Sequence, residues 1–221
     1  MKRFVFMMAL PLFFYACACA PEADKAEVGD AIEIVDIQQD SNHWVVDTIV
    51  SLVSWIGSKP TASHHGNFKL SNGFFVLENG SIKSGVFTIN VNSLEVVDLD
   101  QENNLKLANH LLSEDFFNSA KFPTAKFIMA HIAPFSPDSF PNEKIFTKNP
   151  THIITGNLTL NDSTKSIRFP AIIFTTEKSI SAQANFNINR SDWGLSYGND
   201  QSLGDKFISP TVNLNLDIKT K

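Results

Sequence analysis

The residues best suited to chemistry in this chain are its six histidines, and their spacing argues against a metal site. His64 and His65 are adjacent, and neighbours on an extended strand point to opposite faces, so the two cannot easily share one ion. The other four are scattered without a ligand spacing, at His43, His110, His131 and His152. We therefore predict neither a bound metal nor another cofactor.

The sequence carries none of the patterns that are typical of hydrolases or phosphate-binding enzymes. It has no G-x-S-x-G nucleophile elbow and no Gly-rich phosphate loop. No pair of carboxylates falls on an apolar strand face, where a glycosidase would need one. Beyond Cys19 the chain contains no cysteine, so it has no thiol nucleophile and no disulfide framework. We predict a protein without catalytic residues.

Arg190 is the charged residue with the most informative position. It follows Ile188 by two residues, so it should share the apolar face of the strand predicted over Ile180–Asn189. A guanidinium on that face must be paired or must contact a ligand. Asp192 and Asp205 are the expected partners in a buried ion pair. The functional alternative, which is compatible with the first, is that Arg190 binds a polar head group such as a phosphate or a quinone oxygen.

The N-terminus has the features of an export signal. Lys2 and Arg3 are followed by the apolar run Phe4–Tyr15, which is too short to span a bilayer. Cys17 and Cys19 come directly after it, each preceded by alanine, and this resembles the lipoprotein signal of bacteria. We predict lipidation at Cys19, or else at Cys17, and a location in the bacterial cell envelope as a periplasm-facing or outer-membrane lipoprotein. An ordinary cleaved signal with incidental cysteines is the alternative.

The length of 221 residues fits one domain behind this leader. Residues 1–19 form the predicted signal peptide. Residues 20–42 are acidic and weakly patterned, which predicts a flexible tether, and residues 43–221 are the predicted folded domain. The formal net charge of -5 argues against a nucleic-acid partner. The sequence contains no cluster of Lys and Arg of the kind that would predict electrostatic docking on anionic lipid.

From Trp44 onward, apolar residues recur with the period of two that is typical of half-buried strands. The clearest example is Ile180–Asn189, where apolar and polar residues alternate throughout. Eight or nine such segments can be counted, and the best helical pattern covers Glu102–Leu112, with Leu105 and Leu111 on its apolar side. Many antiparallel strands with a single helix predict an all-β barrel or sandwich. A barrel closed at about eight strands leaves an interior that can hold one ligand.

Four segments, taken together, resemble the YceI-like family. The stretch His110–Phe127 reads HLLSEDFFNSAKFPTAKF, which matches a leucine-ended helix, an S-x-D-F-F turn and a strand of the form Y/F-P-x-A-x-F. Trp44–Lys59 is similar to the family's opening strand, and Gly156–Leu160 to its G-x-L-T-[IL] hairpin. Phe186–Gly194 is similar to its F-x-I-x-R-x-x-[FW]-G segment. The order and spacing of these motifs extend the resemblance from Trp44 to the C-terminus.

The resemblance implies a lipocalin-like antiparallel barrel of about eight strands, with one helix near the barrel mouth, that binds a polyisoprenoid. The expected ligand is a long-chain isoprenoid or quinone-type lipid, whose polar end Arg190, His65 and Lys59 would orient. Each buried methylene of such a chain would contribute about 0.8 kcal/mol. The residues expected to line the interior are Trp55, Phe68, Phe87, Ile89, Leu158, Phe169, Phe186, Ile188, Leu214 and Leu216.

Two other functions remain compatible with the sequence. An envelope stress or interaction protein would use the same inward side chains to fill a solid core, because filling and lining a barrel need the same alternation. An enzyme acting on a lipid or a quinone would use His65 as a base. The sequence also leaves open whether the domain forms a homodimer.

Overall fold

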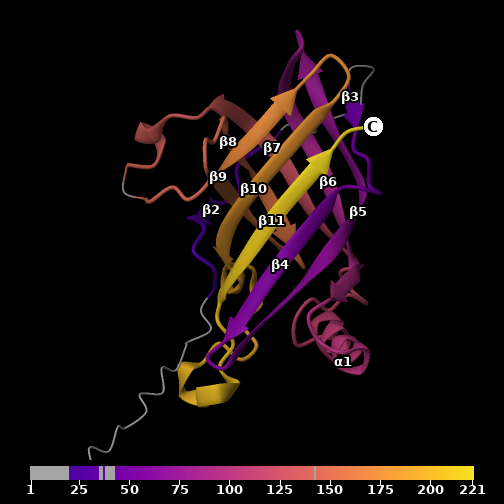
Figure 1. Cartoon of the computed structure of the whole chain (residues 1–221), viewed down its shortest axis with the longest axis vertical. Helices are drawn as coiled ribbons and strands as arrows, with labels where there is room; N and C mark the ends of the chain where they lie inside the picture. The colour runs from indigo at the N-terminus through magenta and orange to yellow at the C-terminus, as the bar shows by residue number, and fades with distance from the viewer. Residues whose placement is uncertain (1–19, 35–36, 38–42, 142) are drawn as a thin grey trace, which may run out of the picture.

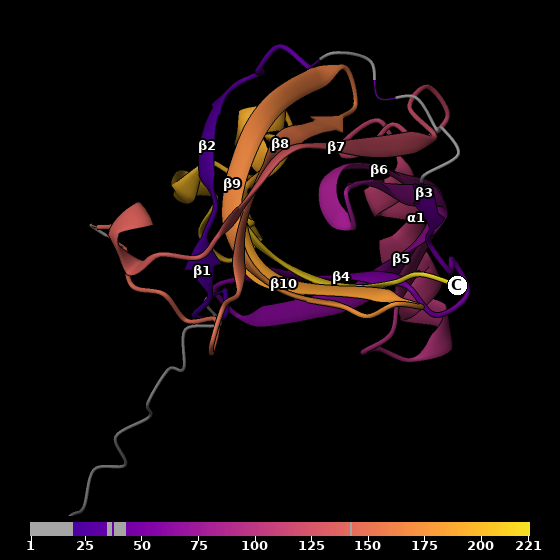
Figure 2. The same cartoon turned by 90° about the horizontal axis from the view of Figure 1, so that it is seen from above.

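The computed structural model describes residues 20–34, 37, 43–141 and 143–221, and shows a closed antiparallel barrel (Figures 1 and 2). Neighbouring strands of the barrel pair in chain order, and β11 pairs with β4 to close the ring. The predicted all-β barrel is confirmed. Its strands are β4 (Leu52–Lys59), β5 (Ala62–Glu78), β6 (Ser81–Val96), β7 (Thr124–Pro134), β8 (His152–Leu160), β9 (Ser163–Thr175), β10 (Ile180–Asn189) and β11 (Thr211–Lys219).

Alternation of apolar and polar residues determines which way each strand faces. In β10, Ala184, Phe186 and Ile188 are buried, whereas the asparagines between them lie outward. The strand predicted over Trp44–Gly57 is divided, because a turn separates β3 (His43–Val45) from β4. Asp47 makes this turn by accepting bonds from two backbone N–H groups further along the chain.

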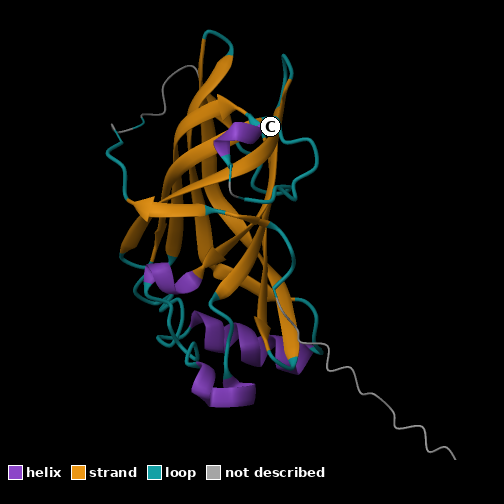
Figure 3. Ribbon diagram, turned by 90° about the vertical axis from the view of Figure 1, so that its left-hand side faces the viewer, coloured by secondary structure: helices purple, strands orange, loops and turns teal. Residues whose placement is uncertain are grey.

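Helix α1 (Gln101–Leu112) lies across one end of the barrel (Figures 1 and 3). Asp100 caps its first turn by accepting a bond from the backbone N–H of Asn103 at 3.0 Å. We call this end the mouth; it is bounded by the β4–β5 hairpin, by α1 and by the segment 190–210, which contains the short 3-10 turns η2 (Arg190–Trp193) and η3 (Gln201–Lys206). Among the described residues, no helix has the length and apolar character that crossing a bilayer would need.

The first described residues form a strap on the barrel wall, so the predicted tether is wrong over residues 20–32, whereas most of its remaining residues lie outside the described part of the chain. Strands β9 and β10 pair directly only near the end opposite the mouth, from Ile180–Thr175 to Gln183–Ile172. Closer to the mouth, β1 (Asp24–Lys25) pairs with β10 and β2 (Glu27–Asp30) pairs with β9. Residues 20–32, the N-terminal strap, therefore complete the wall at the place where β9 and β10 separate (Figure 2).

The strap is fastened at several points. Asp24 is 1% exposed, and its carboxylate accepts bonds from the backbone of Phe146 and Thr147, in the loop between β7 and β8 that holds η1 (Pro137–Ser139). Glu27 pairs with Arg168 at 2.7 Å on β9. Further along, the backbone of Ile32 exchanges two bonds with the Asn157 side chain, and Lys165 pairs with Asp30. The strap is thus part of the folded domain.

Candidate functional site in the barrel interior

The barrel encloses a cavity of about 440 Å³ that reaches toward the mouth. This volume falls in the range of roughly 300–1,000 Å³ that is usual for small-molecule sites. The walls come from the inward positions of the barrel strands, and Leu107, His110 and Leu111 of α1 contribute at the mouth. A barrel whose core was filled solid would not leave such a space, so the interior is lined rather than filled.

The structure places most of the predicted binding residues around this one cavity, because they occupy inward positions of successive strands. Aromatic pairs make part of the wall: the rings of Phe169 and Phe186 stack with their centroids 4.2 Å apart. The predicted residues that line the cavity are Trp55, Lys59, Phe68, Phe87, Ile89, Leu158, Phe169, Phe186, Ile188, Arg190, Leu214 and Leu216.

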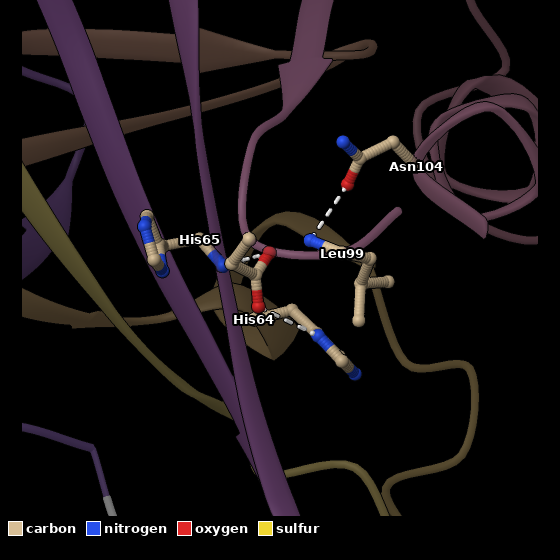
Figure 4. A network of polar contacts seen from close by, with 5 residues as sticks. His64, His65, Leu99 and Asn104 are labelled. Carbon is tan, nitrogen blue, oxygen red and sulfur yellow. Dashed lines mark hydrogen bonds and ion pairs between the residues drawn. The ribbon is translucent and has the colours of Figure 1, made fainter. Parts of the chain in front are cut away.

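His65 is the exception, and its placement at the cavity is corrected. Gly66 and Phe68 are buried on the inner side of β5, so two-residue periodicity turns His64 inward and His65 outward (Figure 4). His64 lines the cavity, and its Nδ1 lies 3.0 Å from Asp98 Oδ2. The side chain of His65 is exposed, while its backbone N–H donates to the other oxygen of Asp98 at 3.2 Å.

Asp98 fixes the segment that leads into α1 against β5. Burial alone would raise the pKa of Asp98. The bonds from His64 and from the backbone of His65, together with attraction to both imidazoles, outweigh this effect and lower the pKa below its ordinary value of 3.8. One residue on, the backbone N–H of Leu99 donates to Asn104 Oδ1 at 3.0 Å (Figure 4). The position of α1 over the mouth therefore depends in part on an ionised Asp98.

Replacing Asp98 with asparagine is expected to lower the free energy of unfolding at pH 7 by about 1 kcal/mol. Because the pKa of Asp98 is lowered in the folded state, the stabilisation by its carboxylate is present above pH 3.8 and is lost as pH falls through the lowered pKa. Urea unfolding measured from pH 7 to pH 3 tests this prediction. The difference in the free energy of unfolding between wild type and Asp98→Asn should become smaller below about pH 4. A gap that stays constant down to pH 3 would contradict this assignment.

Arg190 is buried at the mouth end of β10, but the predicted ion pair with Asp192 or Asp205 is wrong. Its guanidinium instead donates to backbone carbonyls, because the chain folds back over it between β10 and β11. The Nε–H donates to the backbone carbonyl of Ser209 at 3.2 Å. The remaining acceptors are the carbonyls of Leu195, Tyr197 and Ile208. Within the described part of the chain no carboxylate neutralises this charge, and burial lowers the pKa of Arg190 from its ordinary value.

Two buried donors at the mouth end of β4 lack partners. Trp55 Nε1 and Ser58 Oγ have no hydrogen bond to any described residue, although the two residues are only 7% and 3% exposed. Both residues line the cavity, as does the neighbouring Lys59, which forms no ion pair with a described carboxylate. Unpartnered buried polar groups are rare and costly. On the inner face, Trp55, Lys59 and Arg190 make this end of an otherwise apolar cavity rich in donors and positive charge.

Sequence reasoning missed several lining residues. Leu105, expected on the apolar face of the helix, is 59% exposed, and Leu107 contacts the cavity in its place. The asparagine-rich helix has only a weak apolar side, so its rotation was poorly determined by the sequence. Phe116 and Phe117, directly after the helix, also line the cavity, and their conspicuous apolar pair was the signal available. No group of three or more metal-ligating side chains gathers in the described residues.

Comparison with solved structures supports the barrel architecture. BcnA of Burkholderia cenocepacia superposes with a TM-score of 0.60 at 20% sequence identity, over 80% of this chain and 99% of that chain. A polyisoprenoid binding domain of Saccharophagus degradans, implicated in plant cell wall breakdown, superposes with a TM-score of 0.58 at 15% identity, over 81% and 98% of the two chains. At these identities the likeness establishes the fold alone.

Sequence comparison establishes the family. A UPF0312 protein of Shewanella denitrificans is 31% identical over 106 residues, which cover 48% of this chain and 47% of that protein. The match thus spans about half the length of that curated relative. The profile of the YceI-like domain matches residues 44–220, which include all eight barrel strands and leave the N-terminal strap outside. This chain is therefore a member of the YceI-like domain family.

Proposed function

We propose that this protein is a non-catalytic carrier that holds a polyisoprenoid, or another long apolar lipid, inside its barrel in the bacterial cell envelope. The cavity of about 440 Å³, with walls built almost wholly from apolar side chains, is the observation that carries the proposal. An apolar chain gains about 0.8 kcal/mol per buried methylene. The polyisoprenoid binding domain of Saccharophagus degradans, which shares the fold, supports the same ligand class.

The donors at the mouth end favour a ligand with an acceptor head. Trp55 Nε1 and Lys59 can donate to a ligand and Arg190 adds positive charge, and an apolar chain end offers no acceptor to any of them. A quinone oxygen or a phosphate oxygen would meet this requirement. The lipid would therefore lie with its polar end at the mouth and its chain among the phenylalanines of the interior.

We also propose that the mature chain is held to the membrane by a lipid on Cys19 or Cys17, as the sequence before residue 20 predicts. These cysteines lie outside the described residues. The cavity favours the carrier over an envelope interaction protein with a filled core. It also disfavours an enzyme that uses His65 as its base, since His65 faces away from the cavity.

Native mass spectrometry of the protein purified from a bacterial host, followed by organic extraction, tests the carrier function. We expect a co-purifying apolar chain of defined mass. If the protein is recovered without a lipid and takes up neither isoprenoid quinones nor polyprenyl phosphates on incubation, the carrier proposal is refuted and the interaction protein becomes the better explanation.

Replacing Lys59 with methionine tests the orientation of the head. Lys59 lies on the inner face of β4, and removing its ammonium group should lower the affinity for an isoprenoid quinone about fivefold. Affinity for squalene, which has no polar head, should not change. Binding titrations with both ligands measure this, and Lys69→Met is the matched control on the outer side of β5, where Lys69 pairs with Glu95. Equal changes for both ligands would refute a head at the mouth.

A further inference from the structure

The N-terminal strap joins the barrel near the mouth. Asn187 Nδ2 donates to the carbonyl of Pro21 at 2.9 Å, and Asp24 pairs with Phe186 on β10. Asn187 lies three residues before Arg190, at the mouth, and seven residues after Ile180, at the far end of the strand. At about 3.3 Å per residue, Asn187 is roughly 10 Å from the mouth end of β10 and roughly 23 Å from the opposite end.

The point where the strap joins is fixed by buried contacts. Asp24 and Ala26 are 1% and 2% exposed, and the backbone N–H of Ala26 donates to the carbonyl of Asn187 at 3.0 Å. The Asp24 carboxylate also accepts hydrogen bonds from two backbone N–H groups of the β7–β8 loop. No slack chain therefore remains between Pro21 and the barrel wall.

This geometry limits how far the barrel can stand from an anchor. Cys19, the favoured lipidated residue, precedes Pro21 by two residues, and Cys17 precedes it by four. Two residues of fully extended chain span at most about 7 Å, and four span at most about 14 Å. A lipid on either cysteine would thus hold the mouth end of the barrel close to the bilayer surface.

We propose that the mouth end of the barrel lies on the membrane that carries the anchor, so that the cavity exchanges its lipid directly with that bilayer. The inference rests on the anchor and the carrier function proposed above, and adds the surface that faces the membrane. Apolar side chains are exposed around the mouth, among them Leu105 and Leu203 at 59% and 44%. The far end also exposes Ile49 and Phe174, so the place where the chain enters the barrel determines the orientation.

Head-group quenching tests this orientation in the full-length protein, produced in a bacterial host and reconstituted into vesicles of phosphatidylethanolamine and phosphatidylglycerol. A single reporter cysteine is introduced at the mouth end, as Leu105→Cys or Leu203→Cys, or at the far end, as Ile49→Cys, and is labelled with a fluorophore. Nitroxide-bearing head groups are expected to quench the two mouth-end labels at least threefold more than the label at position 49. Equal quenching, or stronger quenching at position 49, would overturn the proposal.

A spacer variant tests the role of the short connection. Twenty Gly and Ser residues inserted between Ala20 and Pro21 add a reach of roughly 25 Å. We expect mouth-end quenching to fall to the level seen at position 49. Transfer of a dansyl-labelled farnesyl probe from the vesicles into the cavity should slow about tenfold. The same insertion between Glu177 and Lys178, in the exposed β9–β10 turn, is the matched control and should change neither quantity.

The outcomes separate this inference from the proposed function. If mass spectrometry finds no acyl group on Cys19 or Cys17, the membrane orientation is overturned together with the anchor. If the protein is acylated and shows oriented quenching but takes up no isoprenoid, the orientation stands and the carrier function fails. If it takes up isoprenoid while quenching is equal at both ends, or if the spacer changes nothing, the carrier function stands and the orientation is refuted.

Discussion

Replacing Ala184 with phenylalanine is expected to weaken lipid binding at least a hundredfold without unfolding the protein. Ala184 is 5% exposed, lies inward on β10 opposite Leu216 and lines the cavity. A phenyl ring there would occupy space otherwise taken by about four methylenes of the ligand, worth about 3 kcal/mol, or a hundredfold in affinity. Titration with an isoprenoid quinone measures the loss, and circular dichroism checks the fold.

The matched control lies one residue further along the same strand. Asn185 is exposed on the outside of the barrel, so Asn185→Phe adds the same ring without entering the cavity. Its affinity for the quinone should stay within twofold of wild type. If Ala184→Phe folds and still binds the lipid normally, the lipid does not lie in the barrel interior.

Replacing Arg190 with methionine is expected to lower the free energy of unfolding by about 3–5 kcal/mol, which is exceptional for one residue. Methionine matches the length of the side chain but has no donor, so the carbonyls of Leu195, Tyr197, Ile208 and Ser209 lose their partner. A buried carbonyl left without a partner costs about 1–3 kcal/mol, and part of this set would be recovered by water. Urea unfolding measures the change.

Arg168→Met is the matched control for this prediction. Arg168 also bonds a backbone carbonyl, that of Ser139, and pairs with Glu27, but its side chain is 29% exposed. Such a partly solvated pair contributes about 0–1 kcal/mol. An Arg190→Met variant no less stable than Arg168→Met would show that Arg190 is not needed to hold the segment 190–210, and would leave ligand binding as its role.

The barrel could be predicted from the sequence because its information is local and repeated. Each strand reports its own inward face through a period of two, so the lining phenylalanines could be named before the fold was known. The same rule also contained the correct answer for His64. Phe68 was predicted to face inward, and two-residue steps from Phe68 reach His64 rather than His65, so the prediction of His65 conflicted with that of Phe68.

The strap and the surroundings of Arg190 could not be predicted because their partners are distant in sequence or belong to the backbone. All four residues of β2 are exposed, so β2 has no apolar alternation to detect. The Asp24 carboxylate accepts a hydrogen bond from the backbone N–H of Phe146, which is 122 residues away in the sequence. For Arg190, the expectation of a carboxylate partner ignored carbonyl groups, whose direction depends on how the chain turns between β10 and β11. Sequence patterns do not encode that turn.

The strap also affects the order in which the protein can fold. It precedes every barrel strand in the sequence, yet Glu27 pairs with Arg168, 141 residues later, and Asp24 pairs with Phe186 on the penultimate strand. Contacts between such distant residues form slowly, because a long loop must be closed before they are made. The strap is therefore among the last segments to dock. Until β9 and β10 have formed and the strap has docked on them, the folding chain has no complete wall and no enclosed site for an apolar ligand.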